Sequence, residues 1–176
     1  MYGVEHAMVD TNSSQPDPFL AEALSHVSLR QGARVLDLAC GRGRHALELA
    51  RQGFSVEAWD RNAEALAELE AQARTEELAI STREVDCEVP PRAGPFDLVL
   101  IFNYLDRTLP PRLLPSVRSG GFLIYCTFTL DREGTHPSDR WCVEPGELQR
   151  GFEGWEILHS VETSGRAGIV ARRTAN

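Results

Sequence analysis

Residues 35–50 read VLDLACGRGRHALELA, and this stretch is the strongest indication of the fold in the sequence. An apolar run passes through Asp37, a turn with Gly41 and Gly43 follows, and apolar residues then recur at helical spacing. Such a strand, turn and helix form a ligand site, because glycines let the backbone approach the ligand and the helix N-terminus presents free N–H groups. The stretch therefore predicts a ligand held at this turn.

The composition is that of an ordinary globular protein. The chain has 176 residues, for which we expect an N-terminal arm over 1–16 and a single domain over 17–176. A net charge of −8 and the lack of a basic run argue against a nucleic-acid partner. We expect no membrane partner, because the chain has no run of about 18 apolar residues, and its first residues do not resemble a secretory signal.

The four cysteines indicate buried thiols rather than a metal site. They are far apart and form no CxxC, so the spacing predicts no zinc site and no other metal site. With no export signal, the simplest interpretation is a reduced, cytoplasmic protein. The cysteines are Cys40, Cys87, Cys126 and Cys142.

The period of the apolar pattern alternates between strand and helix along the chain. A final segment breaks this alternation and predicts two strands, 155–163 and 167–173, joined as an antiparallel hairpin. We therefore expect an α/β fold, a doubly wound, mostly parallel seven-stranded sheet with a C-terminal antiparallel hairpin. The other expected strands are 33–39, 54–60, 79–86, 96–104 and 120–130, and the expected helical segments are 17–27, 44–52, 62–75, 108–119 and 144–152.

In open α/β sheets the ligand lies outside the carboxyl ends of the strands. This rule places Asp60, Asp86, Cys87 and Asn103 around one cleft with the glycine turn. Residues 131–143 have no clear period and follow a strand, so we expect a functional loop at the same edge of the sheet.

Two ligand classes fit the turn. Gly41-x-Gly43-x-x-Ala46 satisfies the dinucleotide fingerprint, which on its own is a weak signal. Asp37 argues against a dinucleotide, since its carboxylate would face a diphosphate with like charge. It suits S-adenosyl-L-methionine, which has an α-ammonium group and no phosphate. Asp60 fits either ligand, because a carboxylate there can accept hydrogen bonds from both ribose hydroxyls.

Over residues 17–172 the sequence resembles the class I S-adenosylmethionine-dependent methyltransferases. VLDLACGRGRHALELA, VEAWDRN and EVDCE match that family's first three motifs, in order. Within the family, NYLDRTLPPRLLPSVRSGGFLIYCTF and VEPGELQRGFEGWEILHSVE are most similar to the small tellurite-resistance-type methyltransferases. The resemblance implies S-adenosyl-L-methionine as cofactor and a small-molecule methyl acceptor. The cofactor-binding residues that it implies are Asp37, Ala39, Cys40, Gly41, Gly43, Asp60, Arg61, Asp86, Cys87 and Asn103.

Two departures from the family pattern concern the turn and the arm. Ala39 stands where the family usually has glycine, which we expect to be tolerated at a negative φ. The arm lacks the tryptophan- and arginine-containing segment of many relatives, so contacts from that region do not carry over.

Residues after the fourth and fifth strands are candidates for the methyl-transfer end of the site. Asn103 and Tyr104 are the catalytic candidates, and Arg107, His136 and Trp141 are weaker candidates for acceptor binding. Four of them have a simpler interpretation: loop hydrogen bonding for Asn103, packing for Tyr104 and Trp141, and a salt bridge or solvation for Arg107.

The reaction implied is in-line displacement at the sulfonium methyl group. FNYL lacks both prolines of the Asn-Pro-Pro-Tyr motif, and no general base stands out, so a soft acceptor such as a thiol, selenium or tellurium species fits best. A nicotinamide-dependent oxidoreductase and a non-catalytic S-adenosylmethionine-binding module remain as alternatives. The sequence predicts no oligomeric state.

Overall fold

The computed structural model describes residues 14–87 and 94–174, and the expected arm over residues 1–16 lies almost wholly outside them. Seven strands form one sheet in the order β3-β2-β1-β4-β5-β7-β6. β1 to β5 run parallel, and β7 runs antiparallel to both β5 and β6. The predicted α/β fold with its C-terminal hairpin is confirmed. The strands are β1 (Arg34–Leu38), β2 (Ser55–Asp60), β3 (Ile80–Glu84), β4 (Phe96–Phe102), β5 (Val117–Phe128), β6 (Glu156–Thr163) and β7 (Arg166–Arg172).

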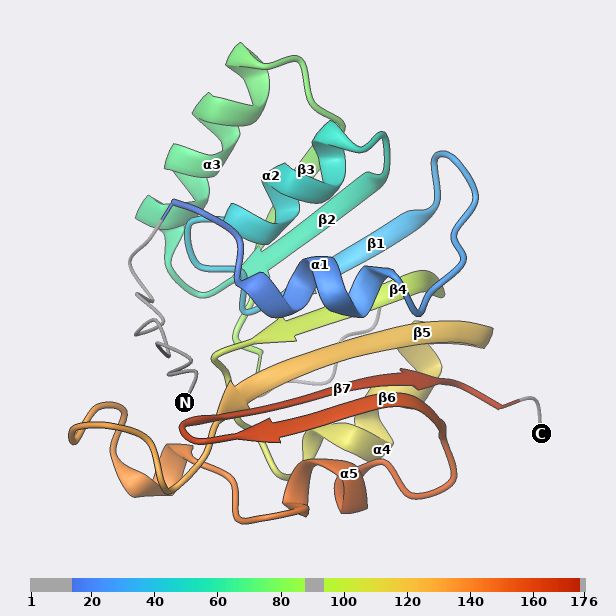
Figure 1. The fold of residues 1–176 in the computed structure, drawn as a ribbon. Coiled ribbons are helices and arrows are strands. Elements are labelled where there is room, and N and C mark those ends of the chain that lie inside the picture. The colour runs from blue at the N-terminus through green and yellow to red at the C-terminus, as the bar shows by residue number, and fades with distance from the viewer. Residues whose placement is uncertain (1–13, 88–93, 175–176) are drawn as a thin grey trace, which may run out of the picture.

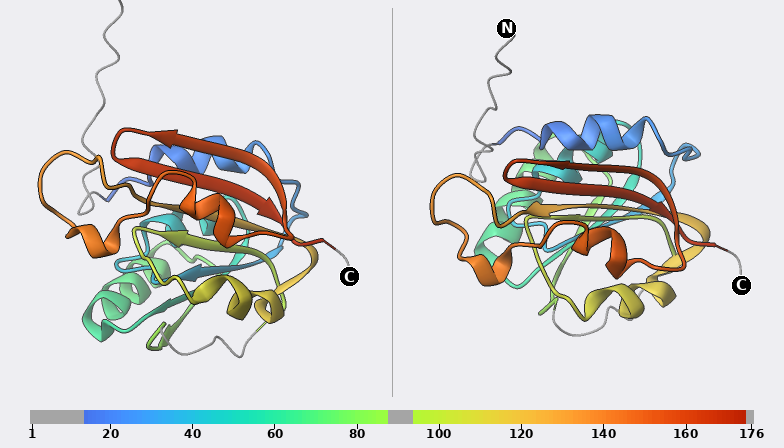
Figure 2. Two further views of the ribbon diagram at one scale, coloured as in Figure 1. Left: turned by 90° about the horizontal axis from the view of Figure 1, so that it is seen from below. Right: turned by 60° about the horizontal axis from the view of Figure 1, so that its bottom comes forward.

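Helices cover both faces of this sheet. Figure 1 shows α1 to α3 on one face, and Figure 2 shows α4 and α5 on the opposite face. The buried side chains divide accordingly into two clusters, one on each face of the sheet. All seven residues of β4 are buried, as expected for a central parallel strand covered on both faces. The helices are α1 (Pro18–Leu24), α2 (Arg44–Arg51), α3 (Ala63–Thr75), α4 (Leu109–Leu113) and α5 (Glu147–Gly151).

One predicted boundary is wrong. Residues 117–119 were expected in a helical connection, but β5 begins at Val117, whose side chain is fully buried. Val117 pairs with Phe96, and the register then shifts, so that Leu98 pairs with Phe122. Pro110 and Pro111 lie in the first turn of α4, where proline is tolerated, and Pro115 ends the α-helix after five residues because it lacks the N–H that a further turn requires.

The carboxyl ends of the parallel strands meet at one edge of the sheet. The turn after β1, the loop after β4 and the loop after β5 all leave from this edge, and the last of these extends past the strand ends (Figure 1). Its base is closed by a bridge between Thr129 and Val143. The fold thus brings together three segments that are far apart in the chain.

Candidate functional site

The glycine turn after β1 has one side open and one side packed. Gly41 has φ +55°, and a Cβ placed on it would meet no atom within 4 Å, so the space in front of its backbone is open to a ligand. Gly43 has φ +72°, but a Cβ there would lie within 3 Å of the Leu69 side chain. Gly43 is therefore required for the packing of α3 beside the turn, and Gly41 faces the site.

The expected negative φ at Ala39 is wrong. Its φ is +58°, in the left-handed region, rather than negative. An L-residue other than glycine is strained there by contact between its Cβ and the following carbonyl group. Relatives usually have glycine at this position, and glycine adopts a positive φ without this strain. The present chain has alanine there and bears the strain.

Asp60 ends β2 beside the turn. One carboxylate oxygen accepts a hydrogen bond from Gly41 N at 2.8 Å, and the other accepts one from Asn62 N at 2.9 Å. Each oxygen keeps a further lone pair. Asp60 can therefore stabilise the turn and still accept hydrogen bonds from ribose hydroxyls.

The main cavity opens at this edge and has a volume of about 780 Å³. Such a volume is in the range of small-molecule sites. At one end it is lined by predicted cofactor residues from the ends of β1, β2 and β3, and at the other by residues of the loops after β4 and β5. The former are Ala39, Asp60, Arg61, Asp86 and Cys87, and the latter include Asn103, Tyr104, Arg107, Arg140 and Trp141.

A second cavity of about 490 Å³ lies on the other side of the glycine turn. Ala39 and Asn103 line both cavities, so the two meet at the ends of β1 and β4. Cys40 and Gly41 line the second cavity, as does Arg44 at the start of α2.

Three predicted site residues line neither cavity: Asp37, Gly43 and His136. Asp37 is 1% exposed, and its carboxylate accepts a hydrogen bond from Ala46 N at 3.1 Å, in the first turn of α2. Burial raises the pKa of Asp37 to about 7, with the negative charge of Asp60 adding to the effect. Asp37 thus fixes the start of α2 from behind the turn, and its contact with a ligand stays a prediction.

The thiols near the turn are not reactive groups. Burial raises the pKa of Cys87 to about 11, and it raises the pKa of Cys40 well above its ordinary value. Only thiolates are good nucleophiles, so both cysteines act as small apolar side chains at the cavity wall.

Asn103 follows β4 with φ +57°, a conformation that asparagine tolerates better than most residues. Its side-chain oxygen accepts a hydrogen bond from the Arg166 guanidinium. Arg166 also pairs with Asp17, the residue that caps α1. This network was not predicted from the sequence, in which Arg166 stands next to the apolar run 167–171 as its only signal.

His45 completes this buried polar group. Its Nε2 accepts a hydrogen bond from Asp17 N at 3.2 Å, and its ring stacks on Phe102 with centroids 4.0 Å apart. Burial lowers the pKa of His45 to about 3, and the charges of Arg44 and Arg166 lower it further. The ring is neutral at physiological pH and does not act as a base there.

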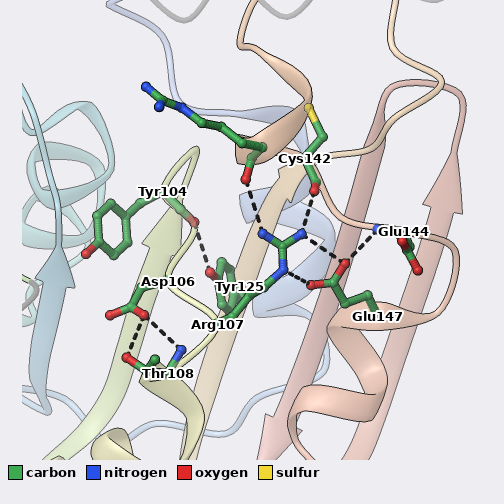
Figure 3. Close-up of polar contacts among 9 residues, drawn as sticks. Tyr104, Asp106, Arg107, Thr108, Tyr125, Cys142, Glu144 and Glu147 are labelled. Carbon is green, nitrogen blue, oxygen red and sulfur yellow. Dashed lines mark hydrogen bonds and ion pairs between the residues drawn. The ribbon is translucent and has the colours of Figure 1, made fainter.

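Arg107 is the acceptor-binding candidate that the structure places most clearly. Its guanidinium contacts Glu147 and the carbonyl oxygens of Arg140 and Cys142, with Nε 2.5 Å from Glu147 Oε1 (Figure 3). The exposed Trp141 lies between these two carbonyls in the chain and lines the cavity. Arg107 therefore holds the loop, and Trp141 is at the rim of the cavity.

The family model described as tellurite resistance protein TehB matches residues 15–170. The chain belongs to the TehB family. The strand order and the C-terminal hairpin are those of class I S-adenosylmethionine-dependent methyltransferases, so the predicted family is confirmed.

A curated TehB relative from Haemophilus influenzae, described as a probable S-adenosyl-L-methionine-dependent methyltransferase, is 29% identical over 140 residues. These residues are 75% of this chain and 49% of the relative, so the chain spans about half the length of that protein. The crystal structure of TehB from H. influenzae has a TM-score of 0.80 at 21% identity, over 93% of this chain and 64% of that one. A coclaurine N-methyltransferase bound to N-methylheliamine and S-adenosylhomocysteine has a TM-score of 0.70 at 14% identity, over 81% of this chain and 50% of that one.

In residues 14–87 and 94–174 of this TehB-family chain, none of the helices has the length and hydropathy that a membrane span requires. Over the same residues, no three histidine, cysteine or acidic side chains gather in a way that could hold a metal ion.

Proposed function

We propose that this TehB-family protein transfers the methyl group of S-adenosyl-L-methionine to a small acceptor bound in the main cavity. The observation that carries the proposal is that one cavity joins Asp60 and Asp86 with the loop residues Arg140 and Trp141. The carboxylates suit the adenosine part of the cofactor, and the loops provide a separate wall for an acceptor. The cofactor supplies an activated methyl group, so the chain has to align the two molecules and exclude water.

The turn after β1 supports this choice of cofactor. The open space before Gly41 leaves room for the amino-acid part of the ligand, and Asp60 keeps acceptors for a ribose. Arg44 lines the adjoining cavity, where a guanidinium would suit the carboxylate of that part. In this arrangement Asp37 stabilises the turn, and above its pKa of about 7 its carboxylate supplies negative charge behind the α-ammonium group.

The acceptor end favours a soft nucleophile. Its arginines are always protonated and cannot take up a proton, and Asp106 is occupied by Thr108 and by Arg112 Nη1 at 2.7 Å. An acceptor with an available lone pair, such as a thiolate or a selenium or tellurium oxyanion, needs no general base there. Asn103 and Tyr104 then serve to orient the reacting groups.

Calorimetric titration with S-adenosylmethionine, S-adenosylhomocysteine and NADH tests the cofactor. We expect the first two to bind and NADH not to bind; binding of NADH alone would favour an oxidoreductase. The acceptor is tested by release of S-adenosylhomocysteine with 2-mercaptoethanol, selenite and tellurite. If none of these turns over while a nitrogen or oxygen acceptor does, the soft-acceptor proposal fails, and binding without any turnover would indicate a non-catalytic module.

A further inference from the structure

Arg107 lies where an acceptor-binding cation was expected, but its donors are already in use. Nε and Nη2 contact the two oxygens of Glu147 at 2.5 and 3.2 Å, Nη1 contacts Arg140 O at 3.1 Å, and Nη2 also contacts Cys142 O at 2.9 Å. These contacts use four of the five N–H donors of a guanidinium. Little hydrogen-bonding capacity is left for a ligand.

Glu147 anchors the arginine to the body of the domain. It is the first residue of α5, and its Oε2 also accepts a hydrogen bond from Glu144 N at 2.8 Å. Partial burial would raise the pKa of Glu147, but the hydrogen bonds from Arg107 and Glu144 N outweigh burial and lower it. The carboxylate is thus charged at neutral pH and holds Arg107 in a two-point contact, as Figure 3 shows.

The two carbonyls that Arg107 binds belong to the residues on either side of Trp141. Trp141 and Arg140 both line the main cavity, and the Arg140 guanidinium lies 5.0 Å from the centre of the Trp141 ring. Trp141 is 43% exposed, so its own packing does little to fix it. The position of this pair depends on the backbone that Arg107 holds.

We propose that Arg107, anchored by Glu147, is a positioning residue that fixes Arg140 and Trp141 as the acceptor-side wall of the cavity. The proposal rests on the proposed methyl transfer only in assigning this wall to the acceptor. Arg107 acts through the loop and does not touch the reacting atoms. Lysine cannot replace it, because an ammonium group cannot contact a carboxylate and two carbonyls in one plane.

The positioning is tested without an acceptor, by acrylamide quenching of Trp141 fluorescence. Each variant is also measured with Trp141→Phe added, and this signal, which comes from the other two tryptophans, is subtracted to leave the signal of Trp141. We expect Arg107→Gln, Arg107→Lys and Glu147→Gln each to increase the quenching of Trp141. The matched control is Glu57→Gln, which breaks a pair with Arg34 of similar exposure at the far end of β1. Unchanged quenching in the Arg107 and Glu147 variants would overturn the proposal.

The functional part is tested with whichever of 2-mercaptoethanol, selenite and tellurite the unmodified protein methylates. We expect Arg107→Gln to raise the KM for that acceptor by about tenfold, as for loss of a positioning contact, while the dissociation constant of S-adenosylmethionine stays within about twofold. Arg107→Gln and Trp141→Ala alter the same wall of the cavity. The double variant should therefore raise the KM no more than the single variant with the larger increase in KM. The proposal would be overturned if the two increases in KM multiplied in the double variant, or if Arg107→Gln weakened the binding of S-adenosylmethionine by more than about twofold. If the unmodified protein methylates nothing, the proposed function fails, and the quenching result still decides the positioning.

Discussion

Asp17 and Arg166 are 149 residues apart in the chain, yet Arg166 Nη2 lies 2.6 Å from Asp17 Oδ2. The Asp17 side chain is 4% exposed and that of Arg166 is 15% exposed. The same guanidinium binds the side chain of Asn103 at the end of β4. This ion pair therefore ties the start of α1 and the start of β7 to the centre of the candidate site.

Removal of Arg166 should be strongly destabilising. Arg166→Gln leaves the Asp17 carboxylate buried without its partner, and we expect the free energy of unfolding to fall by about 3–5 kcal/mol. Chemical denaturation measures it. The control is Arg172→Gln, whose pair with Glu156 is about half exposed on both sides and should change the free energy by less than about 1 kcal/mol. If the two changes cost the same, the buried pair does not stabilise the fold.

Asp60→Ala should weaken both cofactor binding and the fold. The loss of a charged hydrogen-bonding group should cost about 1.5–3 kcal/mol of binding free energy for S-adenosylmethionine. The melting temperature should also fall, because Gly41 N and Asn62 N lose their acceptor. Calorimetry and thermal unfolding measure the two effects, with Glu57→Gln on the same strand as the control. Unchanged affinity in a folded protein would place the cofactor elsewhere.

Ala39→Gly should stabilise the protein. Relief of the left-handed strain at φ +58° outweighs the greater freedom of glycine in the unfolded chain, by about 1 kcal/mol. Glu77→Gly provides a comparison, because Glu77 has φ +53° in the turn after α3 and lines neither cavity. Thermal unfolding should show a higher melting temperature for both variants. A lower value for Ala39→Gly would contradict the conformation at this residue.

His45 should make the protein less stable in acid. Its pKa is about 3 in the native state, against 6.5 ordinarily, so below about pH 6.5 the unfolded chain binds a proton that the native state does not. The free energy of unfolding should therefore fall as the pH drops from 6.5 toward 3, by up to about 1.4 kcal/mol per pH unit. In His45→Gln the amide oxygen can still accept from Asp17 N, and this part of the slope should disappear. An identical pH profile would show that His45 is not the group responsible.

Asp37 should have the opposite pH dependence. Its pKa is about 7 in the native state, so between pH 3.8 and 7 the native state holds a proton that the unfolded chain has lost. This contribution to stability is fully present below pH 3.8 and is lost as the pH rises to about 7. Asp37→Asn should therefore be more stable than the unmodified protein at pH 8, by more than about 1 kcal/mol, if its amide oxygen keeps the bond to Ala46 N.

The same variant tests the predicted role of Asp37 toward the cofactor. At pH 8, Asp37→Asn should weaken binding of S-adenosylhomocysteine, which has an α-ammonium group. Binding of 5′-methylthioadenosine, which lacks that group, should not change. Equal effects on the two ligands would assign Asp37 to the structure of the turn alone.

The sequence was enough to predict the order of strands and helices along the chain, and to predict that residues after β1, β2 and β3 line one cavity. Each of these depends on local properties: apolar period, glycine at the turn, and a carboxylate at the end of a strand. Since parallel strands bring their carboxyl ends to one edge, the sequence predicts that Asp60, Asp86 and Cys87 lie together, and all three line the main cavity. Local signals are read directly from neighbouring residues.

Which polar groups are left for a ligand depends on tertiary contacts. Asp37 is buried and bonded to α2, and Arg107 is held by Glu147, 40 residues away. The left-handed conformation of Ala39 and the pairing of Asp17 with Arg166 were likewise not readable from the chain. The reason is physical: a side chain's partners are set by contacts across the sheet, and these join residues whose separation in sequence carries no signal.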